Sequence, residues 1–446
     1  MSKMKTPICD FVREYAASNA MRLHMPGHKG VGPLGIEAYD ITEIDGADVL
    51  YKSHGIIRES EENAAALFGS TRTVYSTEGS SLSIRAMLYL ACLWAKENGK
   101  HPHILAGRNA HAVFMYAAAM LDFDVTWLYP EDNIFSFASV EQTEKALAAM
   151  DEPPTALYVT SPDYLGNFAN ITDLAKICKK YGVLLLVDNA HGAYTRFLFE
   201  TCHPINLGAD MCADSAHKTL PVLTGGAYLH VSKNAPTLFA ENAERAMALF
   251  ASTSPSYLIL QSLDAANAYL SDGYIAKITR FEDAMGDLCD ALEKAGYMTV
   301  GSEPLKLTLA PKSYGYTGVE LAETLKKSGI VCEFYDADYT VMMFTPETGE
   351  SVLQSVRRVL SDIPKRTPSN VCTPTFARAE CAMSIREAML APSEVVSVRD
   401  ARGRVLADAG VSCPPAIPIV MCGEVIGQEQ IRLFEYYGID TVRVVK

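Results

Sequence analysis

Short apolar runs alternate with polar turns and helical periods over the first 231 residues, a pattern typical of an α/β fold. One helix between these runs is predicted around residues 172–181. Its apolar residues Leu174, Ile177, Cys178 and Tyr181 recur at positions i, i+3, i+4 and i+7, and Thr172 is the expected N-cap. We predict a mainly parallel sheet with seven strands at residues 73–76, 103–105, 125–128, 156–160, 184–187, 211–213 and 227–231.

The pattern changes in the second half of the chain. A long helical period covers residues 263–292. A strand is then predicted from about residue 298. It is followed by a helix at 319–327, strands at 330–335 and 339–345, and a helix at 350–363, which Pro364 ends. We therefore expect an N-terminal segment and large domain at residues 1–285, and a smaller α+β C-terminal domain at residues 286–446.

The composition is that of a globular protein. Of the 446 residues, 49% are hydrophobic and 21% are charged, and the net charge of −14 opposes binding to nucleic-acid phosphates. No apolar run has the length of a membrane span, and Asp10, Arg13 and Glu14 interrupt any signal-like N-terminus. The eleven cysteines include no Cys-x-x-Cys pair, which favours free thiols and no metal site. We predict a cytoplasmic protein with neither a nucleic-acid nor a membrane partner.

Two residues that follow predicted strands have side chains suited to cofactor chemistry. Lys218 follows the strand at residues 211–213, where a lysine can have a lowered pKa and form a Schiff base. Asp188 follows the strand at residues 184–187, and a carboxylate there suits the ring nitrogen of pyridoxal 5′-phosphate (PLP). Alone, each residue also fits an ordinary role, as a solvated lysine or a turn-capping aspartate. Together, the segments DNAH at residues 188–191 and SAHK at residues 215–218 favour the cofactor.

A phosphate-binding turn is predicted where Gly79, Ser80 and Ser81 precede an apolar helix. Free backbone N–H groups, two hydroxyls and the positive end of the helix dipole suit a phosphate dianion, although serine is also an ordinary N-cap residue. His111 follows the strand at residues 103–105 and is either a loop histidine or a ring that stacks on the cofactor opposite Ala190.

Several further motifs follow one another along the chain. They are RLHMPGHKG at residues 22–30, DITEIDG at 40–46, GIIRE at 55–59, SAHKTLPVLT at 215–224, TSPSYL at 253–258, PPAIP at 414–418 and GEVIG at 423–427. Their order resembles that of the ornithine/lysine/arginine decarboxylase family, almost from end to end. The resemblance implies a PLP-dependent enzyme of fold type I, in the short form without an N-terminal wing domain. It also implies decarboxylation of arginine, lysine or ornithine to the amine, in polyamine biosynthesis or acid response.

The resemblance implies roles for the candidate residues. Lys218 would hold the cofactor, Asp188 would pair with its ring nitrogen, and His217 would act in decarboxylation geometry or proton return. The implied catalytic residues are Lys218, His217, Asp188 and His111, and the implied cofactor-binding residues are Gly79, Ser80, Ser81, His111, Asp188, Ala190, His191, Ser215, Lys218, Thr253 and Ser254. In the family, the segment with Thr253 and Ser254 reaches the phosphate of the neighbouring subunit. This implies a homodimer with shared active sites, or a higher oligomer.

Four positions depart from the family pattern. Glu78 replaces the asparagine of an Asn-Gly-Thr/Ser cradle, and Asn189 replaces the glutamate of Asp-Glu-Ala-His. Ala112 stands where a lysine is usual, and Asp163 where a threonine is usual. Since none of these changes removes Lys218, Asp188 or His111, we expect cofactor binding, while the substrate and the reaction stay open.

Other functions also fit this sequence. An aminotransferase or another Cα/Cβ lyase on the same fold would need an arginine for the substrate carboxylate, and a non-catalytic descendant would suit Glu78 and Ala112. A substrate with a cationic side chain would need a carboxylate to bind it. The sequence offers three candidate carboxylates, for which turn and helix-cap roles are favoured. The candidate arginines are Arg386, Arg399, Arg402 and Arg404, and the candidate carboxylates are Glu43, Asp45 and Asp48.

Overall fold

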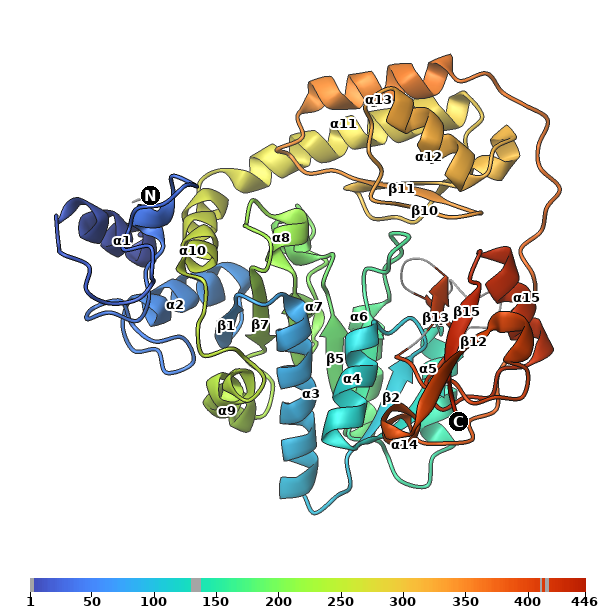
Figure 1. Cartoon of the computed structure of the whole chain (residues 1–446), viewed down its shortest axis with the longest axis horizontal. Helices are drawn as coiled ribbons and strands as arrows, with labels where there is room; N and C mark the ends of the chain where they lie inside the picture. Colours follow the sequence, from blue (N-terminus) through green and yellow to red (C-terminus); the bar gives the residue numbers. More distant parts are fainter. Residues whose placement is uncertain (1–3, 130–137, 410, 414–416) are drawn as a thin grey trace. The chain divides into compact units, whose positions relative to one another are not determined.

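The computed structural model describes residues 4–129, 138–409, 411–413 and 417–446, with no side-chain description for residues 411–413 (Figure 1). The chain forms two compact units. The first contains the residues up to Lys100 together with Ile171–Lys277, and the second contains His101–Asn170 together with Ile278–Lys446. The predicted division near residue 285 stays a prediction. Part of the PPAIP motif, at residues 414–416, lies outside the described residues.

A seven-stranded sheet is the main structural element, as predicted. Its order is β1-β7-β6-β5-β4-β2-β3. Strand β7 runs antiparallel to β1 and β6, whereas β5 and β6, β2 and β4, and β2 and β3 are parallel pairs. The strands are β1 (Arg72–Ser76), β2 (His103–Gly107), β3 (Asp124–Leu128), β4 (Ala156–Thr160), β5 (Leu184–Asp188), β6 (Met211–Asp214) and β7 (Ala227–Val231).

Helices of the first unit accompany β1, β5, β6 and β7. They are α1 (Pro7–Ala17), α2 (Ile56–Phe68), α3 (Ser80–Glu97), α6 (Ile171–Tyr181), α7 (Pro204–Leu207), α8 (Ala216–Thr219), α9 (Thr237–Ala248) and α10 (Tyr257–Ser271), with the 3-10 helices η1 (Glu37–Tyr39) and η2 (Ala193–Phe197). The predicted N-cap of α6 is wrong, because the helix already begins at Ile171 and Thr172 lies in its first turn. Asn170, of a residue type favoured at N-caps, precedes it.

The long helix predicted at residues 263–292 is two helices. Helix α10 ends at Ser271, and α11 (Tyr274–Lys294) begins after Gly273. Gly273 has a φ of 72°, a left-handed conformation that glycine adopts readily and that ends α-helical geometry. The helical periodicity continues across this break, so the hydrophobic pattern alone did not reveal it.

In the second unit, a four-stranded sheet in the order β10-β11-β9-β8 packs with helices on one side (Figure 1). Its strands are β8 (Thr299–Val300), β9 (Lys306–Leu309), β10 (Phe334–Tyr335) and β11 (Thr340–Met343), and its helices are α11, α12 (Gly318–Lys327) and α13 (Glu350–Asp362), with η3 (Pro311–Tyr314). The last two strands and the last two helices were predicted. A strand was also predicted from about residue 298, where β8 lies, whereas β9 was not predicted as a separate strand, since four residues are too short for a clear alternating pattern.

The second unit has two further groups of elements. One consists of the helices that connect strands β2, β3 and β4 along the chain, and the other is a C-terminal α+β cluster. Buried Ile419, Leu433, Phe434 and Val444 form part of the core of this cluster. These elements are α4 (Ala112–Leu121), α5 (Val140–Ala148), α14 (Ile385–Leu390), β12 (Ser393–Ser397), η4 (Val398–Asp400), β13 (Val411–Cys413), β14 (Ile417–Val420), α15 (Gln428–Tyr436) and β15 (Thr441–Val445).

Two predictions about the whole chain can be compared with the described residues. Each cysteine whose side chain is described is a free thiol, as predicted. Within the same part of the chain, we find no helix with both the length and the apolar character that crossing a membrane requires.

Candidate active site

Lys218 lies in a short helix directly after a strand of the large sheet. Strand β6 ends at Asp214, and α8 begins one residue after Ser215. The Lys218 residue is exposed, and its Nζ lies 3.1 Å from Nε2 of His191, whose residue is 6% exposed. A lysine in this position is accessible to a cofactor aldehyde and has a proton acceptor within hydrogen-bond distance.

Asp188 ends the neighbouring strand. Strands β5 and β6 are parallel, and their register places Asp188 opposite Ala213, so the carboxylate and the turn that leads to Lys218 lie at the same end of the sheet. The Asp188 residue is only 2% exposed, and its Oδ1 accepts a hydrogen bond from the backbone N–H of Ala190 at 3.2 Å. The structure thus brings Asp188, His191 and Lys218 to one sheet end, the edge at which α/β folds bind ligands.

The predicted phosphate cradle lies in the same unit. Gly79 precedes the 18-residue helix α3 with a φ of 73°, a conformation that favours glycine. The Ser215 hydroxyl donates to Oγ of Ser80 at 2.8 Å, which joins the cradle to the turn after β6. Ser81 lies in the first turn of α3, whose leading N–H groups have no acceptor within the helix. The arrangement provides hydroxyls, free N–H groups and a positive helix end for a phosphate.

Glu78, one of the departures from the family pattern, has a backbone partner. Its Oε1 accepts a hydrogen bond from the N–H of Ser252 at 2.8 Å. The carboxylate therefore holds the segment that continues into Thr253 and Ser254, both of which are exposed. In this chain the segment lies beside the cradle of its own subunit, and its predicted contact with a neighbouring subunit stays a prediction.

The His217 ring is fixed by the backbone. Its Nδ1 lies 3.0 Å from the carbonyl oxygen of Gly226, so Nδ1 carries the proton that is donated there. Burial lowers the pKa of His217, although the hydrogen bond to Gly226 opposes this effect. The ring is accordingly neutral near pH 7, with Nε2 as a proton acceptor.

His111 belongs to the second unit and caps a helix. It precedes α4 as the N-cap residue, and its Nδ1 accepts a hydrogen bond from the N–H of Val113 at 3.2 Å. The residue is exposed, and Ala112 begins the helix. The stacking role of His111 on a cofactor ring stays a prediction.

Asp163, a further departure from the family pattern, forms hydrogen bonds within its own loop. Its Oδ1 accepts from the backbone N–H groups of Leu165 and Asn167 at 2.9 and 2.8 Å, and its Oδ2 accepts from Nδ2 of Asn167 at 2.8 Å. The fourth departure, Asn189, donates through Nδ2 to Oδ1 of Asp214 at 2.8 Å. Both side chains therefore have a structural partner in this chain.

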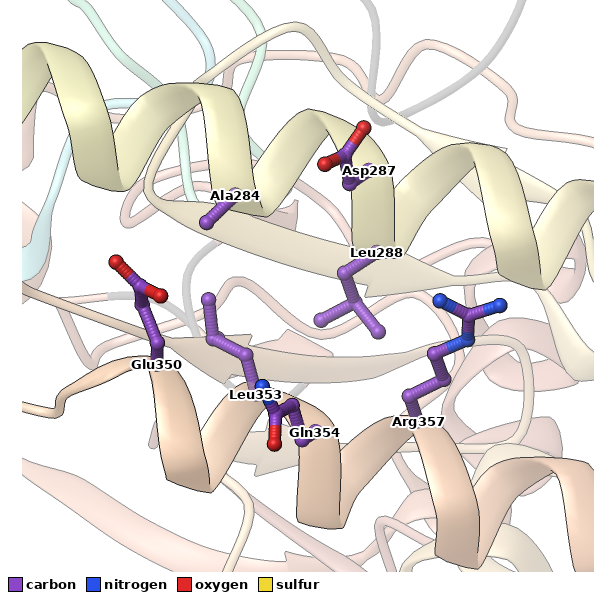
Figure 2. A pocket seen from close by; sticks show the side chains of 7 residues that line it. All are labelled: Ala284, Asp287, Leu288, Glu350, Leu353, Gln354 and Arg357. Atoms are coloured by element: carbon purple, nitrogen blue, oxygen red, sulfur yellow. The ribbon is translucent and has the colours of Figure 1, made fainter.

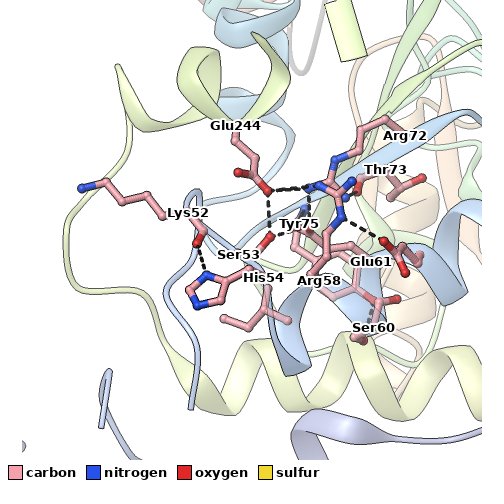
Figure 3. Close-up of polar contacts among 12 residues, drawn as sticks. Lys52, Ser53, His54, Arg58, Ser60, Glu61, Arg72, Thr73, Tyr75 and Glu244 are labelled. Atoms are coloured by element: carbon pink, nitrogen blue, oxygen red, sulfur yellow. Dashed lines mark hydrogen bonds and ion pairs between the residues drawn. The ribbon is translucent and has the colours of Figure 1, made fainter. Parts of the chain in front are cut away.

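The strand that leads to the cradle is held by a buried ion-pair network that the sequence did not reveal (Figure 3). Arg72 Nη2 lies 2.7 Å from Glu61 Oε2 and 2.6 Å from Glu244 Oε1. The other Glu61 oxygen accepts from the backbone N–H of Tyr75 at 2.9 Å. Burial raises the pKa of Glu61 to about 7, despite the opposing effect of Arg72. No local motif joins residues 61, 72 and 244, which lie on α2, β1 and α9.

Several charged candidates have structural roles instead. Asp48 accepts hydrogen bonds from the backbone N–H groups of Val49, His54 and Gly55 and of the first residues of α2. Burial raises its pKa, but these hydrogen bonds outweigh the effect and the pKa is lowered. The favoured helix-cap interpretation is thus confirmed for Asp48. Arg386, Arg399 and Arg404 are likewise engaged, with the carbonyl of Ala119, with Glu435 and with Glu394.

A cavity of about 190 Å³ lies between α11 and α13 in the second unit (Figure 2). Side chains of both helices line it, among them Asp287, Leu288 and Arg357. None of its lining residues is a predicted site residue, so we do not assign the active site to it.

Comparison with protein families decides the assignment of the chain. The model of the Orn/Lys/Arg decarboxylase major domain matches residues 6–280, and that of the C-terminal domain matches residues 365–440. The chain belongs to the Orn/Lys/Arg decarboxylase family. Membership confirms the predicted enzyme class, an amino acid decarboxylase.

Two curated relatives match over nearly the whole chain, and a third matches over part of it. The arginine decarboxylase of Bacillus subtilis is 29% identical over 97% of this chain and 93% of its own length. The arginine decarboxylase of Halalkalibacterium halodurans is 30% identical over 96% of this chain and 92% of its own length. A lysine decarboxylase of Pseudomonas aeruginosa is 24% identical over 58% of this chain and 39% of its own length.

Solved structures confirm the fold. The lysine decarboxylase of Francisella novicida has a TM-score of 0.79 to this chain, at 16% identity, over 99% of this chain and 81% of that one. The constitutive lysine decarboxylase of E. coli has a TM-score of 0.77, at 17% identity, over 99% of this chain and 82% of that one. The predicted α/β fold of type I, with a large mostly parallel sheet and a smaller C-terminal domain, is therefore confirmed.

Proposed function

We propose that this protein is a PLP-dependent decarboxylase that converts a basic amino acid to its amine and carbon dioxide. The observation that carries the proposal is the 3.1 Å contact between Lys218 Nζ and His191 Nε2, at the sheet end that also carries Asp188. These residues lie in the DNAH and SAHK segments that pointed to the cofactor from the sequence. Lys218 is the proposed covalent attachment site.

The residues present fit PLP. The Ser80 and Ser215 hydroxyls, the turn at Gly79 and the leading N–H groups of α3 suit its phosphate. The buried Asp188 carboxylate suits a protonated pyridine nitrogen. When bound, PLP supplies an electron sink for the electron pair that is left on Cα when carbon dioxide departs. Asp188 would sustain this sink by keeping the ring nitrogen protonated.

Two histidines would handle protons in this site. His191 Nε2 accepts a hydrogen bond from the Lys218 ammonium, so it would take the proton that the amine must lose before it can act as a nucleophile. His217 is held neutral, with Nδ1 directed to Gly226 and Nε2 as the acceptor atom. We assign proton transfer near the reacting carbon to His217 Nε2.

Arginine is the substrate to test first. The arginine decarboxylases of two organisms match more than nine-tenths of this chain, whereas the Pseudomonas lysine decarboxylase matches 58% of it. Lysine and ornithine are the other basic candidates. Polyamine biosynthesis or acid response as the context, a cytoplasmic location and a homodimer with shared sites are part of the same proposal.

The experiment supplies the PLP-loaded protein with arginine, lysine and ornithine in separate reactions and identifies the products by mass spectrometry. An amine with release of carbon dioxide from one of them supports the proposal, and the Lys218→Ala variant should lose this activity. Lys233→Ala, which alters an exposed lysine beyond β7, is the matched control and should keep it. A keto acid product would identify an aminotransferase, and bound cofactor without turnover of any amino acid would identify a non-catalytic descendant.

A further inference from the structure

Asp214 is a fully buried carboxylate at the end of β6, one residue before Ser215. Its Oδ2 accepts a hydrogen bond from His203 Nε2 at 2.9 Å and lies 3.5 Å from His230 Nε2. Its Oδ1 accepts from Nδ2 of Asn189 at 2.8 Å. We call His203, Asp214 and His230 the buried charge cluster.

The strand register explains how the cluster assembles. Strands β6 and β7 are antiparallel, with Cys212 opposite His230, so Cys212, Asp214 and His230 lie on one face of the sheet. His203 precedes α7 and completes the cluster from outside the sheet. Phe68 packs against both imidazoles, with ring centroids 5.2 Å from His203 and 4.5 Å from His230. An isolated charge in this apolar setting would be unfavourable.

The charge of the cluster follows from its contacts. Burial raises the pKa of Asp214, but the two histidines outweigh this effect and hold its pKa well below the usual range. Burial lowers the pKa of His230, and Asp214 opposes that effect. Two other neighbours, Cys212 and Tyr228, have raised pKa values and are neutral. The cluster is therefore a buried carboxylate that the two imidazoles stabilise. Among the described residues, no lysine or arginine forms an ion pair with it.

Asn189 connects the cluster to the candidate site. It directly follows Asp188, and its backbone N–H donates to the carbonyl oxygen of Ala213 at 3.0 Å. A glutamate here, as in the family pattern, would place a second carboxylate against Asp214, and two buried like charges repel each other. The amide of Asn189 donates to Asp214 instead. The hydrogen-bond acceptor at residue 214 is thus paired with a neutral donor at residue 189.

We propose that the buried charge cluster positions Asp188 and Ser215, and that Asn189 and Asp214 form an exchangeable acid–amide pair through which it acts. The link to cofactor binding rests on the proposed function, whereas the pairing of residues 189 and 214 does not. Asp214, His203 and His230 are positioning residues in this scheme, because the cluster reaches the candidate site through the contact of Asp214 with Asn189. The other ring nitrogen of His230, Nδ1, lies 2.8 Å from Oγ1 of Thr73.

An exchange of the two side chains tests the pair. Asp214→Asn leaves no carboxylate, Asn189→Asp creates two, and the double variant has one carboxylate in the reversed order at nearly unchanged volume. Urea unfolding of the cofactor-free proteins measures stability. The PLP dissociation constant and the pH titration of the visible absorbance of the PLP-loaded proteins measure the effect on the site. None of these readouts depends on turnover.

We expect each single variant to lose stability and to bind PLP about tenfold more weakly, and the double variant to recover most of both losses. The absorbance titration of each single variant should shift and should return in the double variant. Asp210→Asn is the matched control, because Asp210 is a partly buried carboxylate just before β6 that accepts from the N–H of Leu185 at 2.8 Å. It should lower stability without a shift in the absorbance titration.

Losses in the double variant equal to the sum of the single losses would overturn the pairing. A single-variant titration identical to that of the unaltered protein would overturn the positioning role. If the purified protein contains one equivalent of a transition metal and His203→Gln lacks it, the cluster is a metal site, and the proposal of a metal-free buried charge cluster is overturned. If the unaltered protein binds no PLP, the proposed function fails, and the unfolding data still decide whether residues 189 and 214 are coupled.

Discussion

Replacement of Arg72 by methionine should destabilise the first unit by removing the central cation of its buried network. Glu61 has a fully buried side chain, and without the guanidinium its carboxylate would keep two neutral donors, the N–H of Tyr75 and the Ser53 hydroxyl at 3.3 Å. Glu244 is less affected, because its side chain is 24% exposed and Arg58 lies 3.5 Å away. Breaking a buried ion pair on one side costs about 3–5 kcal/mol. We expect a loss of that size in the free energy of unfolding at pH 8.

The loss should depend on pH in a defined direction. The pKa of Glu61 is already raised to about 7 with Arg72 present, and it should rise further without the guanidinium. Between the ordinary carboxyl value and this raised pKa, the folded state binds more protons than the unfolded state, so stability increases as the pH falls. The deficit of Arg72→Met should therefore be smaller at pH 5.5 than at pH 8.

Urea unfolding of the cofactor-free protein at both pH values is the assay. The double variant Glu61→Gln/Arg72→Met removes the uncompensated charge as well, so it should recover most of the stability and show a weaker pH dependence. A deficit for Arg72→Met below about 1 kcal/mol at pH 8 would refute the reasoning, since that is the range of surface ion pairs. An equal deficit at both pH values would refute the assignment of the effect to Glu61.

Three further predictions concern the active site. Asp188→Asn should retain PLP but raise the activation barrier by several kcal/mol, since an amide cannot hold the ring nitrogen protonated; steady-state kinetics would contradict this by near-normal turnover. Glu78→Ala should release the segment that contains Ser252, which limited proteolysis at residues 251–256 would detect, whereas Glu97→Ala at the far end of α3 should not. After subunit exchange, inactive Lys218→Ala and inactive Thr253→Ala/Ser254→Ala should together regain up to half the activity per heterodimer, and no recovery despite confirmed exchange would contradict shared sites.

The large sheet could be predicted because each of its strands is a short apolar run with a polar boundary. The structure extends three of these strands at the carboxyl end, to Gly107, Asp188 and Asp214. The small sheet was predicted only in part, because one strand was expected from about residue 298, where the structure has the two short strands β8 and β9. The break at Gly273 was missed because the apolar positions of α10 and α11 follow one helical period across it.

The candidate site shows a similar division between local and distant signals. Lys218 and Asp188 stand in short motifs directly after strands, so their neighbourhood could be predicted from the sequence. The buried charge cluster could not, since the β6–β7 register brings residues 214 and 230 together, His203 joins them from the start of α7, and no fixed spacing marks the three. Until the pairing of β6 with β7 is known, His230 on β7 and His203 before α7 could equally occupy two unrelated positions in the core.

The central claim is that Lys218 carries the cofactor, and chemical trapping tests it most directly. The PLP-loaded protein would be reduced with borohydride, digested and mapped by mass spectrometry. We expect one reduced cofactor adduct per chain, on Lys218. Reduction should also remove the visible absorbance at about 420 nm that a lysine-bound cofactor gives. An adduct on another lysine, or bound PLP without any lysine adduct, would contradict it.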